Sequence, residues 1–186
     1  MTKLTGPQII SQLREKLQFS SGRHLYGVLG SYAQLQQFEQ TDLAQARDPQ
    51  GQPLPSAINL NRELLARIDD GDLRQLIKDE ARYPQAVQRR LGQEFDRLLG
   101  DHLLSSSTTD RPFHLVVLKQ IELLFTYDLD LSVLRTRATN QNHILLLLPG
   151  QRYSEQIIIF HEAEQRFQRT LPNNLIAEHH LWELDQ

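Results

Sequence analysis

Residues 24–30 read HLYGVLG, a short apolar segment that ends in glycine. A stretch rich in glutamine, glutamate and alanine follows at once, over residues 33–47. An apolar segment, a glycine and a polar helical stretch, in this order, predict a β-strand, a tight turn and an α-helix. We therefore expect residues 24–30 to form a strand of a sheet, with Gly30 at its carboxyl end.

Two longer apolar runs predict central strands. Residues 113–118 and 144–148 are nearly continuous in apolar side chains, as expected of strands that are covered on both faces. Pro149 and Gly150 are expected to end the second run abruptly. Weaker patterns predict three more strands, the last two at edges of the sheet, over residues 55–60, 157–160 and 175–182.

Helical patterns separate these strands. An asparagine, Asn59 or Asn61, is placed to cap one helix, and Pro84 marks the restart of another, because proline suits the first turn of a helix. The helices are predicted over residues 4–17, 33–47, 62–68, 73–104 and 129–139, and the breaks between them over residues 48–53, 69–72 and 105–110.

Strands that alternate with helices indicate the fold class. This order favours an α/β protein with a mainly parallel sheet and helices on both faces. We expect one domain over residues 1–186, with an N-terminal helix in residues 1–20 and a C-terminal extension over 151–186. The length suffices to bury a core, and a composition of 39% hydrophobic and 23% charged residues is typical of globular proteins.

Composition also excludes several classes of site. The chain has no cysteine, so disulfides, thiol catalysis and cysteine-bound metals are excluded. A net charge of −3 gives no general attraction to nucleic acid. Residues 1–12 lack the apolar core of a signal peptide, and the longest aliphatic run, residues 144–148, is too short to span a bilayer. We expect a cytoplasmic protein without a membrane partner.

The glycine after the first strand invites comparison with a phosphate-binding loop. Such a loop has the pattern G-x-x-x-x-G-K-[ST], in which glycines admit the phosphates, lysine binds them and the hydroxyl holds magnesium. Counted from Gly30, the last three positions hold Leu35, Gln36 and Gln37. The partner strand should end in an acidic magnesium ligand, but Lys119 stands there. The context of a nucleotide site is present, whereas its phosphate- and magnesium-binding groups are missing.

Residues 115–125, LVVLKQIELLF, resemble the LLLDNIELLF signature of BrxF, the small P-loop protein family of type 3 bacteriophage exclusion (BREX) defence systems. Residues 58–64, INLNREL, resemble the segment after the second strand of that family. The resemblance implies a P-loop NTPase-like fold. In it, Gln36 and Gln37 match the phosphate-loop lysine and hydroxyl, and Lys119 matches the magnesium aspartate.

The missing phosphate- and magnesium-binding groups and the resemblance together predict a catalytically inactive adaptor subunit of an anti-phage defence complex. Its partners would be large defence proteins, among them a PglZ-type phosphatase-like protein, a methyltransferase and a helicase. No cofactor is expected, and ATP with magnesium would bind only if the site were rebuilt. One hypothesis places the ammonium of Lys119 where the metal would lie.

Two other functions stay open. The first is a divergent NTPase whose site is rebuilt around Lys119 or by a neighbouring subunit. The second is a nucleic-acid-binding module, for which the sequence offers the pairs Arg89/Arg90, Arg135/Arg137 and Arg166/Arg169. A metal site is not indicated, because His161 and Glu162 lack the second histidine of an H-E-x-x-H motif.

Overall fold

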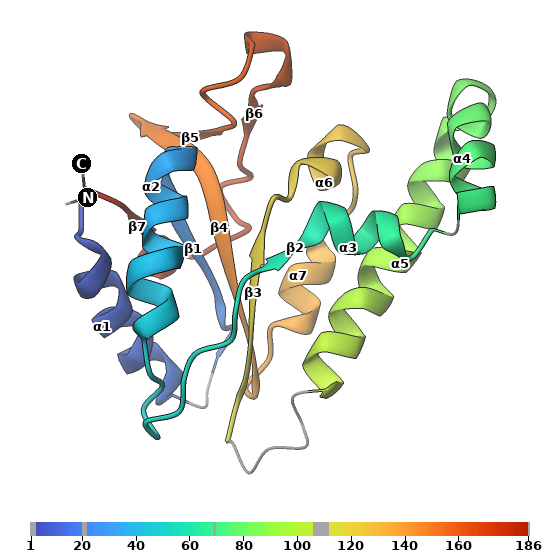
Figure 1. The fold of residues 1–186 in the computed structure, drawn as a ribbon. Coiled ribbons are helices and arrows are strands. Elements are labelled where there is room, and N and C mark those ends of the chain that lie inside the picture. The colour runs from blue at the N-terminus through green and yellow to red at the C-terminus, as the bar shows by residue number, and fades with distance from the viewer. Residues whose placement is uncertain (1–2, 20–21, 69, 106–111, 186) are drawn as a thin grey trace.

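The computed structural model describes residues 3–19, 22–68, 70–105 and 112–185. Figure 1 shows a central sheet with helices packed on both sides, and the two chain ends beside each other. Of the predicted linker over residues 105–110, only Ser105 is among the described residues, as the last residue of a helix. The predicted break over residues 69–72 is described only from Asp70 onwards, where the next helix already begins.

The sheet is mostly parallel, which confirms the predicted fold class. Five strands lie side by side in the order β2-β3-β4-β1-β7, and each neighbouring pair is parallel. Two short strands add antiparallel pairs: β5 pairs with the end of β4, and β6 pairs with β5. The strands are β1 (Leu25–Gly30), β2 (Ile58–Asn59), β3 (His114–Lys119), β4 (Asn142–Tyr153), β5 (Gln156–Ile159), β6 (Arg169–Thr170) and β7 (Leu181–Glu183).

Helices connect the strands and cover both faces of the sheet. Pro84 begins a helix, as predicted, and the side chain of Asn59 caps another by accepting the amide of Arg62 at 3.0 Å. The helical elements are α1 (Gly6–Leu17), α2 (Tyr32–Gln37), η1 (Phe38–Leu43), α3 (Leu60–Ala66), α4 (Asp70–Arg82), α5 (Pro84–Ser105), α6 (Glu122–Thr126), α7 (Ser132–Arg137), η3 (Gln165–Phe167) and η4 (Glu178–His180).

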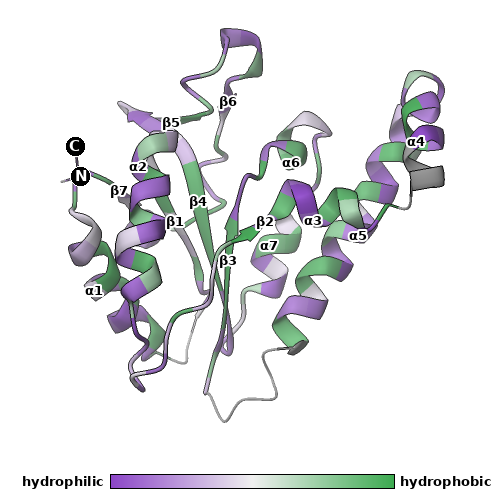
Figure 2. Ribbon diagram, viewed as in Figure 1, coloured by the Kyte–Doolittle hydropathy of each residue, from purple (hydrophilic) through white to green (hydrophobic). Residues whose placement is uncertain are grey.

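Alternating side chains of β1 explain why both faces of the sheet are covered. Leu25 and Leu29 belong to one apolar cluster, which α3, α5, α6 and α7 complete. Tyr26 and Val28 belong to the other, which α1, α2 and η1 complete. In Figure 2 the apolar stretches of these helices turn toward the sheet. The long helix α5 extends beyond the sheet and carries α4 at its outer end (Figure 1).

One predicted boundary was wrong, because β4 runs through Pro149 and Gly150 to Tyr153 instead of ending there. The strand changes partners at this point. Pro149 is the last residue in register with β1, and Gly150 begins the antiparallel pairing with β5. The carbonyl of Pro149 accepts the amide of Phe160. Proline lacks an amide donor, but this pairing needs only its carbonyl, so the strand continues.

Other predicted elements are shorter than expected. The helix expected over residues 33–47 consists of α2 followed by the π-helical segment η1. The strand expected over residues 55–60 is reduced to β2, since Asn59 already serves as the cap of α3. The helix expected over residues 129–139 spans only α7.

Candidate functional site

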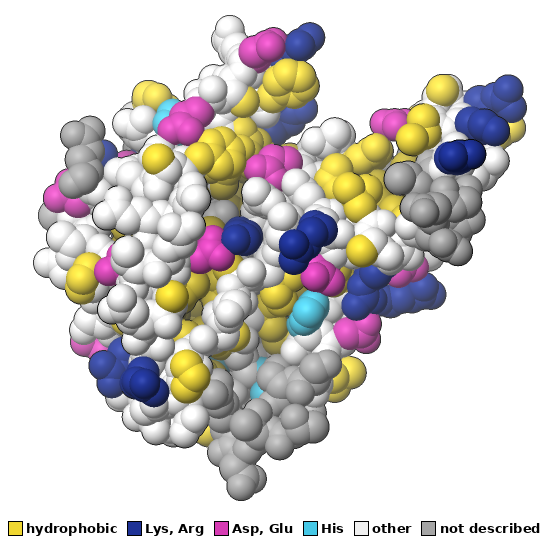
Figure 3. Space-filling view, in the orientation of Figure 1, with side chains coloured by type: hydrophobic (Ala, Val, Ile, Leu, Met, Phe, Trp, Pro, Cys, Tyr) yellow, Lys and Arg dark blue, Asp and Glu magenta, His cyan; other side chains and the backbone are white. Residues whose placement is uncertain are grey.

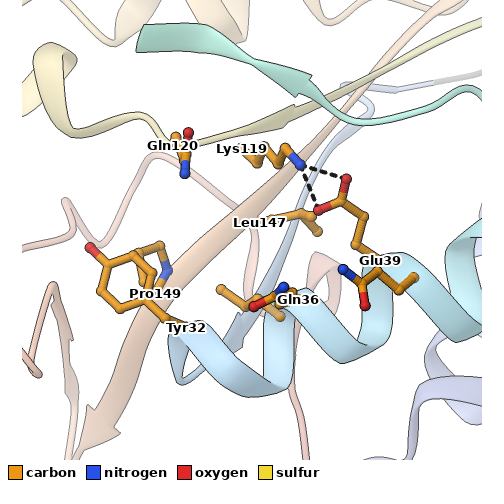
Figure 4. Close-up of a pocket in the computed structure, with 9 residues that line it drawn as sticks. Tyr32, Gln36, Glu39, Lys119, Gln120, Leu147 and Pro149 are labelled. Carbon is orange, nitrogen blue, oxygen red and sulfur yellow. Dashed lines mark hydrogen bonds and ion pairs between the residues drawn. The ribbon is translucent and has the colours of Figure 1, made fainter. Parts of the chain in front are cut away.

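The topology creates one crevice at the carboxyl edge of the sheet. After β1 the chain enters α2 on one face, whereas after β3 it enters α6 on the opposite face. Ligands of open α/β sheets bind at such switch points, beyond the carboxyl ends of the strands. A pocket of about 320 Å³ lies there, lined by residues of α2, η1, β4 and the end of β3. Figure 4 shows these side chains.

An ion pair crosses this pocket. The ammonium of Lys119, at the end of β3, lies 2.6 and 2.8 Å from the two carboxylate oxygens of Glu39, which η1 carries. The side chain of Lys119 is 32% exposed and that of Glu39 is 24% exposed, so the pair is partly shielded from water. Figure 4 shows both side chains reaching toward each other between the strand and the helix. The only lysine that the sequence offered for a rebuilt site therefore has a counter-ion within the chain.

The junction between β1 and α2 leaves no loop for a phosphate. The strand ends at Gly30 and the helix begins at Tyr32, with Ser31 as its cap. A capping box closes this end: the amide of Ser31 donates to Oε1 of Gln34 at 2.8 Å, and the amide of Gln34 donates to Oγ of Ser31 at 3.1 Å. Phosphate loops bind their ligand through free backbone amides. Here the amides of Ser31 and Gln34 already donate to side chains of the capping box.

Acidic side chains surround the next residue, Tyr32. Its amide donates to Oε2 of Glu162 at 3.4 Å, and its hydroxyl donates to Oε1 of Glu122 at 3.1 Å. Burial raises the pKa of Tyr32 to about 12, helped by the charge and hydrogen bond of Glu122 and by the charge of Glu162. Carboxylates at this position repel a phosphate, because two like charges at short range are unfavourable.

Polar side chains after the end of β3 are also hydrogen-bonded to one another. Gln120 follows Lys119 with a φ of 51°, and its side chain accepts a hydrogen bond from Nδ2 of Asn59. Asn61 donates to Oε2 of Glu122 at 2.7 Å and accepts the amide of Leu123 at 3.1 Å. Glu122 therefore serves as an acceptor at the start of α6.

The predicted site residues are only partly brought together. Leu35, Gln36 and Lys119 line the same pocket, with Leu35 only 6% exposed as part of the apolar core. Gly30 lines a neighbouring depression, and a Cβ placed on it would lie 3.1 Å from Leu184. Gln37 is exposed at the end of α2, where its carbonyl accepts the hydroxyl of Thr41 at 2.7 Å.

Several residues that shape the pocket were missed in the sequence. The spacing of Ser31 and Gln34 is the S-x-x-Q pattern of a capping box, which could have predicted the early start of α2. Glu39 and Glu162 have no such signal. Glu39 faces Lys119 from 80 residues away, and Glu162 reaches Tyr32 from 130 residues away.

The arginine pairs suggested for nucleic acid mostly contact the protein itself. Arg137 forms a two-point ion pair with Asp96, at 2.8 and 2.9 Å, and Arg166 lies 3.0 Å from Glu164. Arg169 donates to the carbonyls of Arg166 and Gln168. Figure 3 shows basic and acidic side chains interspersed over one face of the molecule, without a continuous basic track.

The described residues hold neither a candidate metal cluster nor a membrane-spanning helix. Among them, no group of three or more histidine and acidic side chains is placed to hold a metal ion. His161 faces one carboxylate, that of Glu162, at 4.0 Å. Within the same part of the chain, no helix combines the length and the apolar character needed to cross a bilayer.

Comparison with known proteins gives no relative. No family model matches the chain, and neither does any curated protein or solved structure.

Proposed function

We propose that the chain is a catalytically inactive, P-loop-like scaffold that serves as a cytoplasmic adaptor subunit of a BREX-like anti-phage defence complex. The observation that carries the proposal is the closure of the nucleotide position by the chain's own groups. Lys119 is paired with Glu39, and the amides of Ser31 and Gln34 are bonded to side chains. Phosphoryl transfer depends on groups that stabilise phosphate charge, and here those groups serve the fold.

The arrangement of the strands supports the P-loop-like part of the proposal. β4 lies between β1 and β3. Ligands of open parallel sheets bind in the crevice beyond the carboxyl ends of the strands, and Gly30 and Lys119 end the strands on the two sides of β4. In this proposal Lys119 takes the electrostatic role of the missing cation, with Glu39 as its counter-charge. The defence complex and its PglZ-type partner rest on the resemblance of residues 115–125.

Exposed aromatic side chains beside the closed pocket support a protein-binding role. Tyr32 is 41% exposed and Phe167 is 51% exposed. Both line a depression together with the buried side chains of Phe125 and Phe160. The rings of Phe125 and Phe160 meet edge to face, with centroids 5.4 Å apart. Aromatic residues are enriched at the centres of protein interfaces, where they fill pockets of the partner. We call the surface of Tyr32, Phe125, Phe160 and Phe167 the aromatic depression.

The experiment is co-purification of the chain with the PglZ-type protein of the same defence system. The wild-type chain is expected to co-purify, and Phe167→Ala is expected to weaken binding about tenfold, which is typical of removing a central aromatic contact. Tyr83→Ala is a matched control, because Tyr83 is 62% exposed but lies between α4 and α5. The proposal would be wrong if the wild-type chain did not co-purify, or if both variants weakened binding equally.

A further inference from the structure

A second pocket lies at the amino edge of the sheet, opposite the carboxyl-edge crevice. Its volume is about 350 Å³, and it is formed by the last turn of α1, the residues before β1 and the segment that contains η4. Five of its lining side chains are basic or titrate to a positive charge: Lys16, Arg23, His24, His179 and His180. Among the described lining residues there is no acidic side chain. We call it the basic pocket.

The basic side chains of this pocket lie close enough to influence one another, and no acidic side chain is among the described lining residues. Burial first, and then the neighbouring His179, Lys16 and His24, lower the pKa of His180 to about 4. Other charged pairs in this protein bring opposite signs together, as in the pair of Arg137 and Asp96. Lys16 and Arg23 bring two positive charges to one concave site, so an anion that enters it relieves their repulsion.

The side chains of the pocket differ in how far they are exposed to a ligand. Arg23 is exposed and Lys16 is half-buried, so their charged ends are available to a ligand. His24 is only 4% exposed, and its ring stacks on that of His143 with centroids 4.0 Å apart. Burial lowers the pKa of His24, so its ring borders the pocket as a neutral group at neutral pH and not as a source of charge. Phe19, which is 60% exposed, adds a flat apolar wall.

We propose that the basic pocket binds the phosphate group of a small ligand, either inorganic phosphate or a phosphate monoester. The guanidinium of Arg23 and the ammonium of Lys16 are the donors that phosphate recognition uses most. The volume admits one phosphate with a small substituent, and Phe19 is placed to contact an organic substituent. The site is separate from the carboxyl-edge crevice, so it does not depend on the proposed adaptor function.

The test is a titration of the full chain with inorganic phosphate and, separately, with phenyl phosphate, at constant ionic strength and neutral pH. Histidine ring resonances are followed by NMR. Saturable shifts of His24, His179 and His180 are expected with at least one of the two ligands. Tighter binding of phenyl phosphate would identify a monoester site with a contact to Phe19, and equal binding would identify a site for the free anion.

Variants decide whether the shifts come from this pocket. Lys16→Ala and Arg23→Ala are each expected to weaken binding about tenfold, as for the loss of one charged hydrogen bond. Arg14→Ala is the matched control, because Arg14 is exposed on the same helix and is not among the lining residues. Circular dichroism checks that each variant is folded. The absence of saturable shifts with both ligands, or an equal effect of Arg14→Ala and Lys16→Ala, would overturn the proposal.

Discussion

Replacing Trp182 with alanine is expected to lower the free energy of unfolding by about 3 to 5 kcal/mol, the usual cost of removing a large aromatic side chain from a core. Trp182 is 1% exposed, and its ring stacks on that of Tyr26 with centroids 5.8 Å apart. Its indole nitrogen donates to Oε1 of Gln12 at 2.7 Å. One side chain of β7 thus joins the sheet to α1, so the end of the chain stabilises the whole fold.

Urea denaturation of the wild-type chain and the variant measures this loss. Phe167→Ala is the matched control from the same C-terminal region, because Phe167 is 51% exposed and contacts the guanidinium of Arg166 at 4.6 Å from its ring centroid. Its substitution is expected to change the free energy of unfolding by less than about 1 kcal/mol. If Trp182→Ala cost no more than Phe167→Ala, the described packing of β7 on the sheet would be wrong.

Acidification is expected to destabilise the protein through a buried histidine cluster. His143 is fully buried on β4, where its ring stacks on His24 and its Nδ1 lies 3.3 Å from the hydroxyl of Tyr26. Burial, followed by the charge of His24, lowers the pKa of His143 to about 3. The folded state therefore resists protonation, whereas the unfolded chain accepts a proton near the ordinary histidine pKa of 6.5.

The sign of the effect follows from linkage between protonation and folding. Above a pH of about 6.5 both states hold neutral His143, so stability is complete. As the pH falls from there toward the lowered pKa, the unfolded state binds the proton first, and stability is lost. The loss is on the order of 5 kcal/mol, since each unit of pKa difference corresponds to about 1.4 kcal/mol. His180, whose pKa is also lowered, acts in the same direction.

Denaturation at a series of pH values between neutral and acid tests this expectation. In His143→Leu, the part of the pH-dependent loss that comes from His143 is expected to disappear, whereas the smaller contribution of His180 remains. His161→Leu serves as the control, since His161 lies outside the stacked cluster of His24, Tyr26 and His143. A pH profile of His143→Leu identical to that of the wild-type chain would contradict the assigned role of this residue.

Local patterns predicted most of the fold. The apolar run that ends at Gly30 becomes β1, which begins at Leu25, one residue after the start of the predicted segment, and Pro84 begins α5 as expected. Both features depend on properties of adjacent residues, which a sequence records directly. The continuation of β4 through Pro149 could not be predicted in this way. It depends on pairing with β5, so a distant segment overrides the local signal of proline and glycine.

Local patterns likewise predicted only part of the candidate site. The missing phosphate-loop groups were visible at Leu35, Gln36 and Gln37, because a motif is a local pattern. What replaces them was not visible, since Glu39 reaches Lys119 only after β3 has paired into the sheet. The basic pocket likewise combines side chains from both ends of the chain, Lys16 and His179 among them. Contacts between remote segments create the chemistry of both pockets.

The measurement that tests the central claim most directly is calorimetric titration of the purified chain with ATP, ADP and GTP, with and without magnesium. The same titrations are made on Lys119→Met and on Lys16→Ala, so that binding in the basic pocket is recognised by its loss in Lys16→Ala. With Lys119 held by Glu39 and the amides of the β1–α2 junction occupied, no magnesium-dependent binding is expected at millimolar nucleotide. Magnesium-dependent binding at micromolar nucleotide that is lost in Lys119→Met would show a rebuilt nucleotide site and contradict the proposed inactive scaffold.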